Sequence, residues 1–269
     1  MTLPSSGTMT ANMINVELGR SGTAVFDING TPERTLAEKP SGIIKFSDFY
    51  GKSNLKPAQA THFDSISGSD YVDTAPGAIT HSIVKTAGSS FNTSSPTKFG
   101  GNNYFSASAP QQVGLYPYTL YNLNELYWTL ELWTYEITGS LGSILSSRSG
   151  TAVGWCWTTS GLRAKINGTW SETQMTWTQP SLSNWHYMTL VRAGSELRMF
   201  VDGTRVATKT GVSTIDQPSL NVYMGNARSD GGTENLFKGY VDDYQFYISN
   251  TNAACARYNA NFTPPTAPF

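Results

Sequence analysis

Four tryptophans gather in the stretch 155–177, and they are Trp155, Trp157, Trp170 and Trp177. Sugar rings stack on aromatic faces, while guanidinium, amide and carboxylate groups hydrogen-bond sugar hydroxyls. Arg163, Asn167 and Glu172 lie in the same stretch and offer those groups. The pattern predicts a carbohydrate site built from Trp155, Trp157, Trp170, Arg163 and Asn167. Trp155 and Trp157 share one face of a strand, which is also typical of a buried core, so core packing is the alternative.

A second polar group of residues is another candidate for sugar binding. It consists of Asn226, Arg228, Asp230 and Asn235. Gly231-Gly232 lies within it, and two consecutive glycines favour a loop of adaptable conformation.

Catalysis is not expected. Glycoside cleavage needs two carboxyl groups about 5–10 Å apart, whereas Glu125, Glu131 and Glu136 are spaced so that neighbours fall on different faces of a strand or too far apart. The chain has three histidines for a Ser-His-acid triad: His62, His81 and His186. The sequence contains neither a phosphate-binding glycine loop before a helix nor a His/Cys cluster with metal-ligand spacing.

Charge and composition narrow the class of protein further. Charged residues make up only 14% of the chain and the formal net charge is -1, so there is no basic field to attract nucleic acid or a membrane surface. No window is apolar enough to span a bilayer, and the start MTLPSSGTMT lacks the basic and apolar regions of a secretory signal. We therefore expect a soluble protein that is not exported by a cleaved signal.

The two cysteines, Cys156 and Cys255, fit neither a zinc site nor a disulfide framework by their spacing. Two free, half-buried thiols in a reducing cytoplasm are expected, with a single disulfide bridge as the alternative.

The elements that would position these residues fall into two parts, 1–56 and 61–269, joined by a linker at 55–60. In the first part Asn12 or Asn15 is predicted to cap a short helical turn that Gly19 ends. Thr31-Pro32 predicts a second helix start, and Ser47 a third cap. This small part has few apolar residues, so we expect it to dock on a partner.

The second part shows short β-runs separated by Gly, Pro, Asn, Asp and Ser, which is typical of a β-sandwich. The predicted strands are Tyr104–Ser106, Trp128–Glu136, Ser143–Ser147, Gly154–Thr158, Leu162–Ile166, His186–Arg192, Glu196–Val201, Thr204–Thr208, Asn221–Met224 and Gly239–Ile248. Asp202-Gly203 predicts a two-residue hairpin turn, because both residues of a type I′ turn take positive φ. Asn167-Gly168, between AKI and TWS, predicts a second one.

Several motifs in this order resemble laminin-G-like domains of the concanavalin A-like superfamily. They are Trp128–Trp133, Trp185–Arg192, Leu197–Gly203, Val222–Gly225 and Phe237–Asp243. The resemblance implies an all-β fold: a concanavalin A-like, laminin G-type antiparallel β-sandwich jelly roll preceded by a small, mostly irregular N-terminal module. It also implies a structural role for His186. The Glu-x-Asp-x-(x)-Glu pattern of the glucanase branch is missing.

A structural calcium ion is a further implication of the resemblance, because such domains often hold one where the first and last strands meet. Asp64 and Asp242 match its carboxylate ligands, and the Ser65–Asp70 loop would add carbonyl oxygens. The alternative is that Asp64 caps a turn and Asp242 is an exposed polar residue of a strand.

The opening segments LPSSGTMT, INVELGR and SGIIKFSDFYGKSN resemble a module at the start of phage tail and fibre proteins, and Ala256–Pro265 resembles the end of phage virion domains. The resemblance implies a virion protein, made in the host cytoplasm, whose residues 1–56 bind other virion proteins. The expected role is that of a non-enzymatic tail fibre or appendage that attaches to host-surface glycans. The alternative is a capsid or tail decoration protein acting through protein contacts only; a cellular adhesion protein or lectin is disfavoured by the missing signal. A homo-oligomer such as a trimer is expected.

Overall fold

The computed structural model describes residues 3–4, 6–18, 20–37, 39–50, 52, 59–61, 66–67, 70–71, 83–85, 90–92, 96–99, 103–106, 113–115, 122–139, 142–149, 152–216, 221–225, 237–249, 255 and 258–267. Several residues singled out above lie outside the described residues: His62, Asp64, His81, Asn226, Arg228, Asp230 and Asn235.

The N-terminal residues form three short helical elements around a small apolar cluster. These are α1 (Ala11–Glu17), α2 (Thr31–Leu36) and a 3-10 helix at Phe46–Phe49. The buried residues of this cluster are Leu3, Ile14, Leu36, Ala37, Ile44 and Phe49. We refer to residues 3–52 as the N-terminal module.

The caps of these helices differ from the predicted ones. Thr10, rather than Asn12 or Asn15, caps α1, and its hydroxyl accepts a hydrogen bond from Met13 N at 3.2 Å. The 3-10 helix begins after Lys45, whose N–H donates to the Asp48 carboxylate at 2.7 Å, so Ser47 is not the cap. The predicted start of α2 at Thr31 is confirmed.

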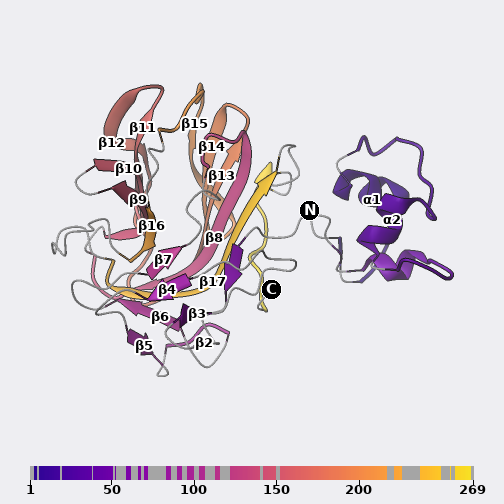
Figure 1. The fold of residues 1–269 in the computed structure, drawn as a ribbon, viewed down its shortest axis with the longest axis horizontal. Coiled ribbons are helices and arrows are strands. Elements are labelled where there is room, and N and C mark those ends of the chain that lie inside the picture. The colour runs from indigo at the N-terminus through magenta and orange to yellow at the C-terminus, as the bar shows by residue number, and fades with distance from the viewer. Residues whose placement is uncertain are drawn as a thin grey trace.

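The described strands form two antiparallel sheets (Figure 1). Sheet A runs in the order β15 (Thr204–Lys209), β14 (Glu196–Val201), β13 (Trp185–Ala193), β8 (Tyr127–Glu136), β17 (Gly239–Ser249), β6 (Asn103–Ser106) and β5 (Ser90–Asn92), with β1 (Gln59–Thr61) also paired to β17. Sheet B runs in the order β12 (Thr169–Thr176), β11 (Gly161–Ile166), β10 (Ala152–Thr158), β9 (Ser143–Ser149), β16 (Asn221–Met224), β7 (Val113–Leu115), β4 (Ile83–Lys85), β3 (Asp70–Tyr71) and β2 (Ile66–Ser67). The predicted all-β sandwich is confirmed.

The main core lies between the two sheets. Side chains alternate along each strand, so β8 sends Trp128, Leu130 and Leu132 inward, and β10 sends Trp155 and Trp157 inward to meet them. All five are completely buried.

The outer face of sheet A is also covered, by Cys255 and residues 258–262 near the C-terminus. Tyr258 and Phe262 pack on Phe200, with Phe262 5.4 Å from the Phe200 ring. The Phe262 N–H donates to the Gly203 carbonyl at 2.9 Å. Both faces of the central strands are therefore packed, which explains why both faces of β8 carry aromatic residues.

The cysteines are free, as expected, but both are buried rather than half-buried. Burial raises the pKa of Cys255 to about 11. None of the described helices has the length and apolar character needed to cross a membrane.

Candidate functional site

Trp155 and Trp157 belong to the core. In the antiparallel register they face Ala164 and Leu162 of β11, and both indoles are completely buried between the sheets. This corrects the prediction that the pair stacks on a sugar, because no ligand can reach either ring.

Trp170 lies on the opposite, outer face of sheet B. It pairs with Lys165 across β11 and β12, and 38% of it is exposed. All seven tryptophans of the chain lie within the described residues, and Trp170 has the largest exposed fraction among them. Its ring is thus within reach of a ligand from solvent.

Charged groups surround Trp170 on this face. Lys165 forms an ion pair with Asp216, with 2.6 Å between Nζ and Oδ2, and both side chains are well exposed. Arg163 lies two positions before Lys165 on β11, hence on the same face, and is half-buried. We call Arg163, Lys165, Trp170 and Asp216 the β11–β12 face.

Asn167 has a structural role that the sequence did not indicate. Its φ is 53° and that of Gly168 is 77°, as the predicted type I′ turn requires. Its Oδ1 accepts hydrogen bonds from Ser213 N, Ser213 Oγ and Thr214 N at 2.8, 2.8 and 3.1 Å, and its Nδ2 donates to the Gly211 carbonyl at 2.7 Å. The amide holds the 211–214 loop, and because Asn167 is exposed its assignment as a sugar ligand stays a prediction.

Asp242, the described half of the predicted calcium site, lies in β17 and is buried, so it is not the exposed strand residue of the alternative interpretation. Its carboxylate accepts backbone N–H groups from Phe99 at 3.3 Å and Asp243 at 2.8 Å. With Asp64 outside the described residues, the calcium site stays a prediction. Within the described part of the chain, no group of three or more His, Cys, Asp or Glu residues is placed to hold a metal ion.

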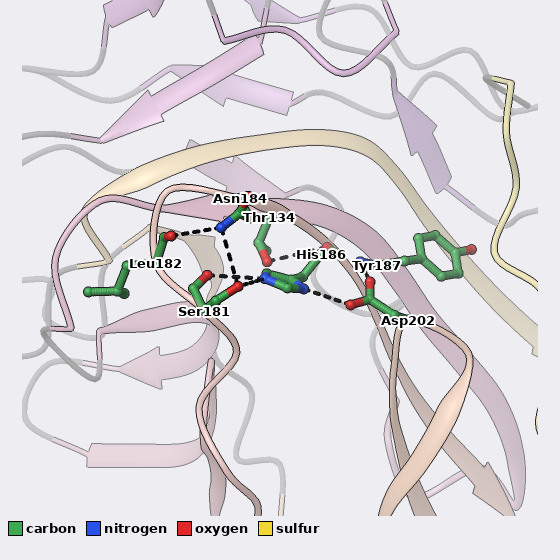
Figure 2. Close-up of polar contacts among 7 residues, drawn as sticks. All are labelled: Thr134, Ser181, Leu182, Asn184, His186, Tyr187 and Asp202. Carbon is green, nitrogen blue, oxygen red and sulfur yellow. Dashed lines mark hydrogen bonds and ion pairs between the residues drawn. The ribbon is translucent and has the colours of Figure 1, made fainter.

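A polar cluster that sequence reasoning missed lies where β13 begins, between the 177–184 loop and the Asp202-Gly203 turn (Figure 2). His186 Nδ1 is 2.7 Å from Asp202 Oδ2, and His186 Nε2 is 3.0 Å from Ser181 Oγ. The other Asp202 oxygen accepts the Tyr187 N–H at 2.9 Å. Ser181 and Asp202 could not be linked to His186 from the sequence, because the turn of a hairpin and a preceding loop bring them together.

The contacts run from Ser181 to His186 to Asp202, as they do in the serine, histidine and aspartate of a hydrolytic triad. One further contact of His186 is not part of such a triad. His186 Nε2 is also 3.0 Å from the Ser181 carbonyl oxygen, which can only accept a hydrogen bond. When Nε2 carries a proton it donates to this carbonyl and cannot take a proton from the Ser181 hydroxyl. In that protonated form His186 is a double donor.

The electrostatics of the pair agree with this assignment. The hydrogen bond to Asp202 raises the pKa of His186 above its ordinary value of 6.5, although burial opposes the rise. Burial tends to raise the pKa of Asp202, but hydrogen bonds from His186 and the Tyr187 N–H hold it below its ordinary value.

Comparison with known proteins identifies the fold of the sandwich. Residues 99–254, more than half of the chain, match the family described as the concanavalin A-like lectin/glucanases superfamily. No curated protein matches the chain in sequence.

Solved structures are similar in fold at low sequence identity. Trypanosoma rangeli sialidase in complex with sialic acid matches at 14% identity and a TM-score of 0.52, over 84% of this chain and 36% of the sialidase. The binding domain of Paraclostridial Mosquitocidal Protein 1 matches at 10% identity and a TM-score of 0.51, over 75% of this chain and 50% of that one. Domain 4 of the Geobacillus stearothermophilus arabinanase AbnA, in complex with arabinotriose, matches at 12% identity and a TM-score of 0.48, over 74% of this chain and 97% of that domain.

Proposed function

The chain belongs to the concanavalin A-like lectin/glucanases superfamily, and from that membership we propose that its β-sandwich binds carbohydrate without cleaving it, through the β11–β12 face. The observation that carries the proposal is the exposure of Trp170 beside an exposed ion pair. A sugar ring stacks on the indole, and its hydroxyls hydrogen-bond to Lys165, Asp216 and Arg163.

Flat, exposed sugar sites of this kind bind weakly, so attachment to a cell surface relies on several copies. Linking binding sites in one assembly raises the overall avidity about 10²- to 10⁴-fold without any new contact. We propose that the protein acts as a homo-oligomeric component of a phage tail fibre or appendage, in which many copies of the β11–β12 face meet host-surface glycans.

The N-terminal module is the proposed attachment to the particle. Beyond its small core it exposes 91% of Val25, 78% of Ile43 and 40% of Phe46. Exposed apolar side chains are candidate contacts for a protein partner. This supports contacts between the module and other virion proteins, in line with its resemblance to the first module of phage tail and fibre proteins.

The proposal is tested with the full-length chain on a glycan array and on host cells. Trp170→Ala is expected to lower the affinity for the bound glycan about tenfold, because one stacked ring is lost. Val206→Ala is the matched control, since Val206 is 39% exposed on β15 in the other sheet. The recovered glycan is expected to be intact.

Three outcomes would contradict the proposal: wild-type protein that binds no glycan, a Trp170→Ala variant that binds as well as wild type, or a shortened glycan after incubation. The alternative role as a capsid or tail decoration predicts instead that Trp170 is buried against neighbouring subunits in assembled particles. Quenching of Trp170 fluorescence in particles, by difference from Trp170→Ala particles, separates the two roles.

A further inference from the structure

The 177–184 loop is held at one end of the sandwich by a titratable side chain. We propose that His186 is a pH-dependent clasp, which in its protonated form ties the Ser181 segment of this loop to the Asp202-Gly203 turn and on deprotonation lets it go.

The charged imidazolium is the form that satisfies this geometry most fully. Two partners of the ring can only accept, the Asp202 carboxylate at 2.7 Å from Nδ1 and the Ser181 carbonyl at 3.0 Å from Nε2, while the Ser181 hydroxyl at 3.0 Å from Nε2 can accept or donate. A neutral imidazole has only one N–H. Once the proton is lost, the Nδ1–H stays with the carboxylate, and the Nε2 lone pair faces the Ser181 carbonyl, so the Ser181 hydroxyl is the one group of the segment that can still bond to the ring.

Besides the clasp, two hydrogen bonds join the described residues of this loop to β8 of sheet A. The Ser183 N–H donates to the Glu136 carbonyl at 2.7 Å, and Gln179 Nε2 donates to the Glu136 carboxylate at 2.8 Å. Asn184 Nδ2 bonds Ser181 Oγ at 3.3 Å and the Leu182 carbonyl at 3.0 Å, contacts that stay within the loop (Figure 2). Deprotonation therefore frees Ser181 while Ser183 stays on β8.

The charged groups around His186 favour the protonated form. Asp202 faces the ring from the β14–β15 turn. From β8, the Thr134 hydroxyl donates to the His186 backbone carbonyl at 3.5 Å, and the Glu136 carboxylate accepts from Gln179 of the loop. Lys98, with its Nζ 3.6 Å above the Trp133 ring, is the opposing cation, and its field acts on Asp202 and Asp242. The carboxylate is in direct contact with the ring, whereas Lys98 interacts with Asp202, so the attraction of Asp202 dominates.

The sign of the pH dependence follows from this. A group whose pKa is higher in the folded chain stabilises the fold fully below its unfolded pKa, and this contribution is lost as the pH rises through the folded value. The clasp is thus closed below the ordinary histidine value of 6.5 and opens above the raised pKa of His186.

Hydrogen exchange of the full-length chain tests the clasp. Amide protection in 177–184, corrected for intrinsic exchange at each pH, is expected to fall about tenfold from pH about 5.5 to about 9 as a charge-assisted hydrogen bond is lost. The midpoint should coincide with the titration of the His186 ring by NMR, identified as the resonance that His186→Gln removes.

Three variants sharpen the test. His186→Gln should abolish the pH dependence of loop protection. Ser181→Ala should preserve it, since the carbonyl is the acceptor that matters. Asp202→Asn, which tolerates the φ of 50° at this position, should move the midpoint to lower pH. Loop protection that follows pH equally in His186→Gln, or a dependence that Ser181→Ala removes, would overturn the proposal.

Discussion

Arg192 is a charged side chain that is completely buried on the inner face of β13. Among the described residues, no carboxylate forms a hydrogen bond with its guanidinium. It donates instead to four carbonyl oxygens, those of Leu123, Gly194, Val212 and Ser213, at 2.7 to 3.3 Å. One side chain thereby joins three loops at the same end of the sandwich.

We predict that Arg192→Met lowers the free energy of unfolding by about 3 kcal/mol or more, because several buried carbonyls lose a charged donor at once. Urea unfolding followed by tryptophan fluorescence measures the change. Lys165→Met is the control, since it removes an exposed cation from an exposed ion pair and should cost no more than about 1 kcal/mol. Equal losses in the two variants would show that the carbonyl network contributes little.

For single residues, the sequence predicted which side chains share one face of a strand, but not what that face packs against. The period of two correctly placed Trp155 and Trp157 on one face, but only the pairing with Leu162 and Ala164 shows that this face is the core. The exposure of Trp170 depends on its register opposite Lys165. Arg192 and His186 lie in the same predicted strand, and their partners come from loops and turns whose folded positions the sequence pattern does not give.

Among the elements, the β14–β15 turn supports the covering segment 258–262. Gly203 has a φ of 76°, and a Cβ at this position would overlap with the Phe262 carbonyl. The Phe262 ring packs between Tyr187, Phe200 and Tyr258. Glycine at 203 is therefore required by the turn and also by the closeness of this segment.

A comparison of two glycine variants separates the requirement of the turn from the requirement of the nearby 258–262 segment. Gly168→Ala and Gly203→Ala introduce the same strain of about 1–2 kcal/mol at nearly equal φ, but a Cβ at Gly168 has nothing within 4 Å. We predict that Gly203→Ala is the more destabilising by about 1 kcal/mol or more in urea unfolding, and that limited proteolysis cuts the 258–267 segment faster. Similar stability and similar cleavage in the two variants would show that the packed segment adds little.

The strands were predictable where side-chain period and turn chemistry agree. The ten predicted strands are confirmed with bounds within two residues, and both type I′ turns have the expected positive φ. The strands β1–β5 and β7 were not predicted because two or three residues show no period, and the eight-residue β12 was indicated only as the segment that follows the predicted Asn167-Gly168 turn. The expected linker 55–60 already enters β1 at Gln59. The cap of α1 was assigned wrongly because several adjacent polar residues could all cap a helix, and only Thr10 has the extended backbone that does so.

At the scale of the whole molecule, the chain has separate apolar clusters that share no residue. The cluster of the N-terminal module centres on Ile14 and Phe49, and the main cluster of the sandwich includes Trp128 and Trp157. A module of about 50 residues buries little apolar surface and is only marginally stable alone. We therefore expect the module and the sandwich to unfold as separate cooperative units.

The distribution of tryptophans makes this expectation testable in the full-length chain. The module has none, whereas all seven lie in the stretch 128–185 of the sandwich. Phe49→Ala removes a completely buried ring, a loss of about 3–5 kcal/mol that exceeds what a module of this size can sustain. Circular dichroism should then lose its helical signal from the start of the urea titration, while the transition seen by tryptophan fluorescence stays where it is in wild type. Trp157→Ala is the reciprocal control and should move the fluorescence transition alone. If Phe49→Ala moved the fluorescence transition as well, the module and the sandwich would be one cooperative unit. The proposal that the module is a separate part that attaches the sandwich to a particle would then be wrong.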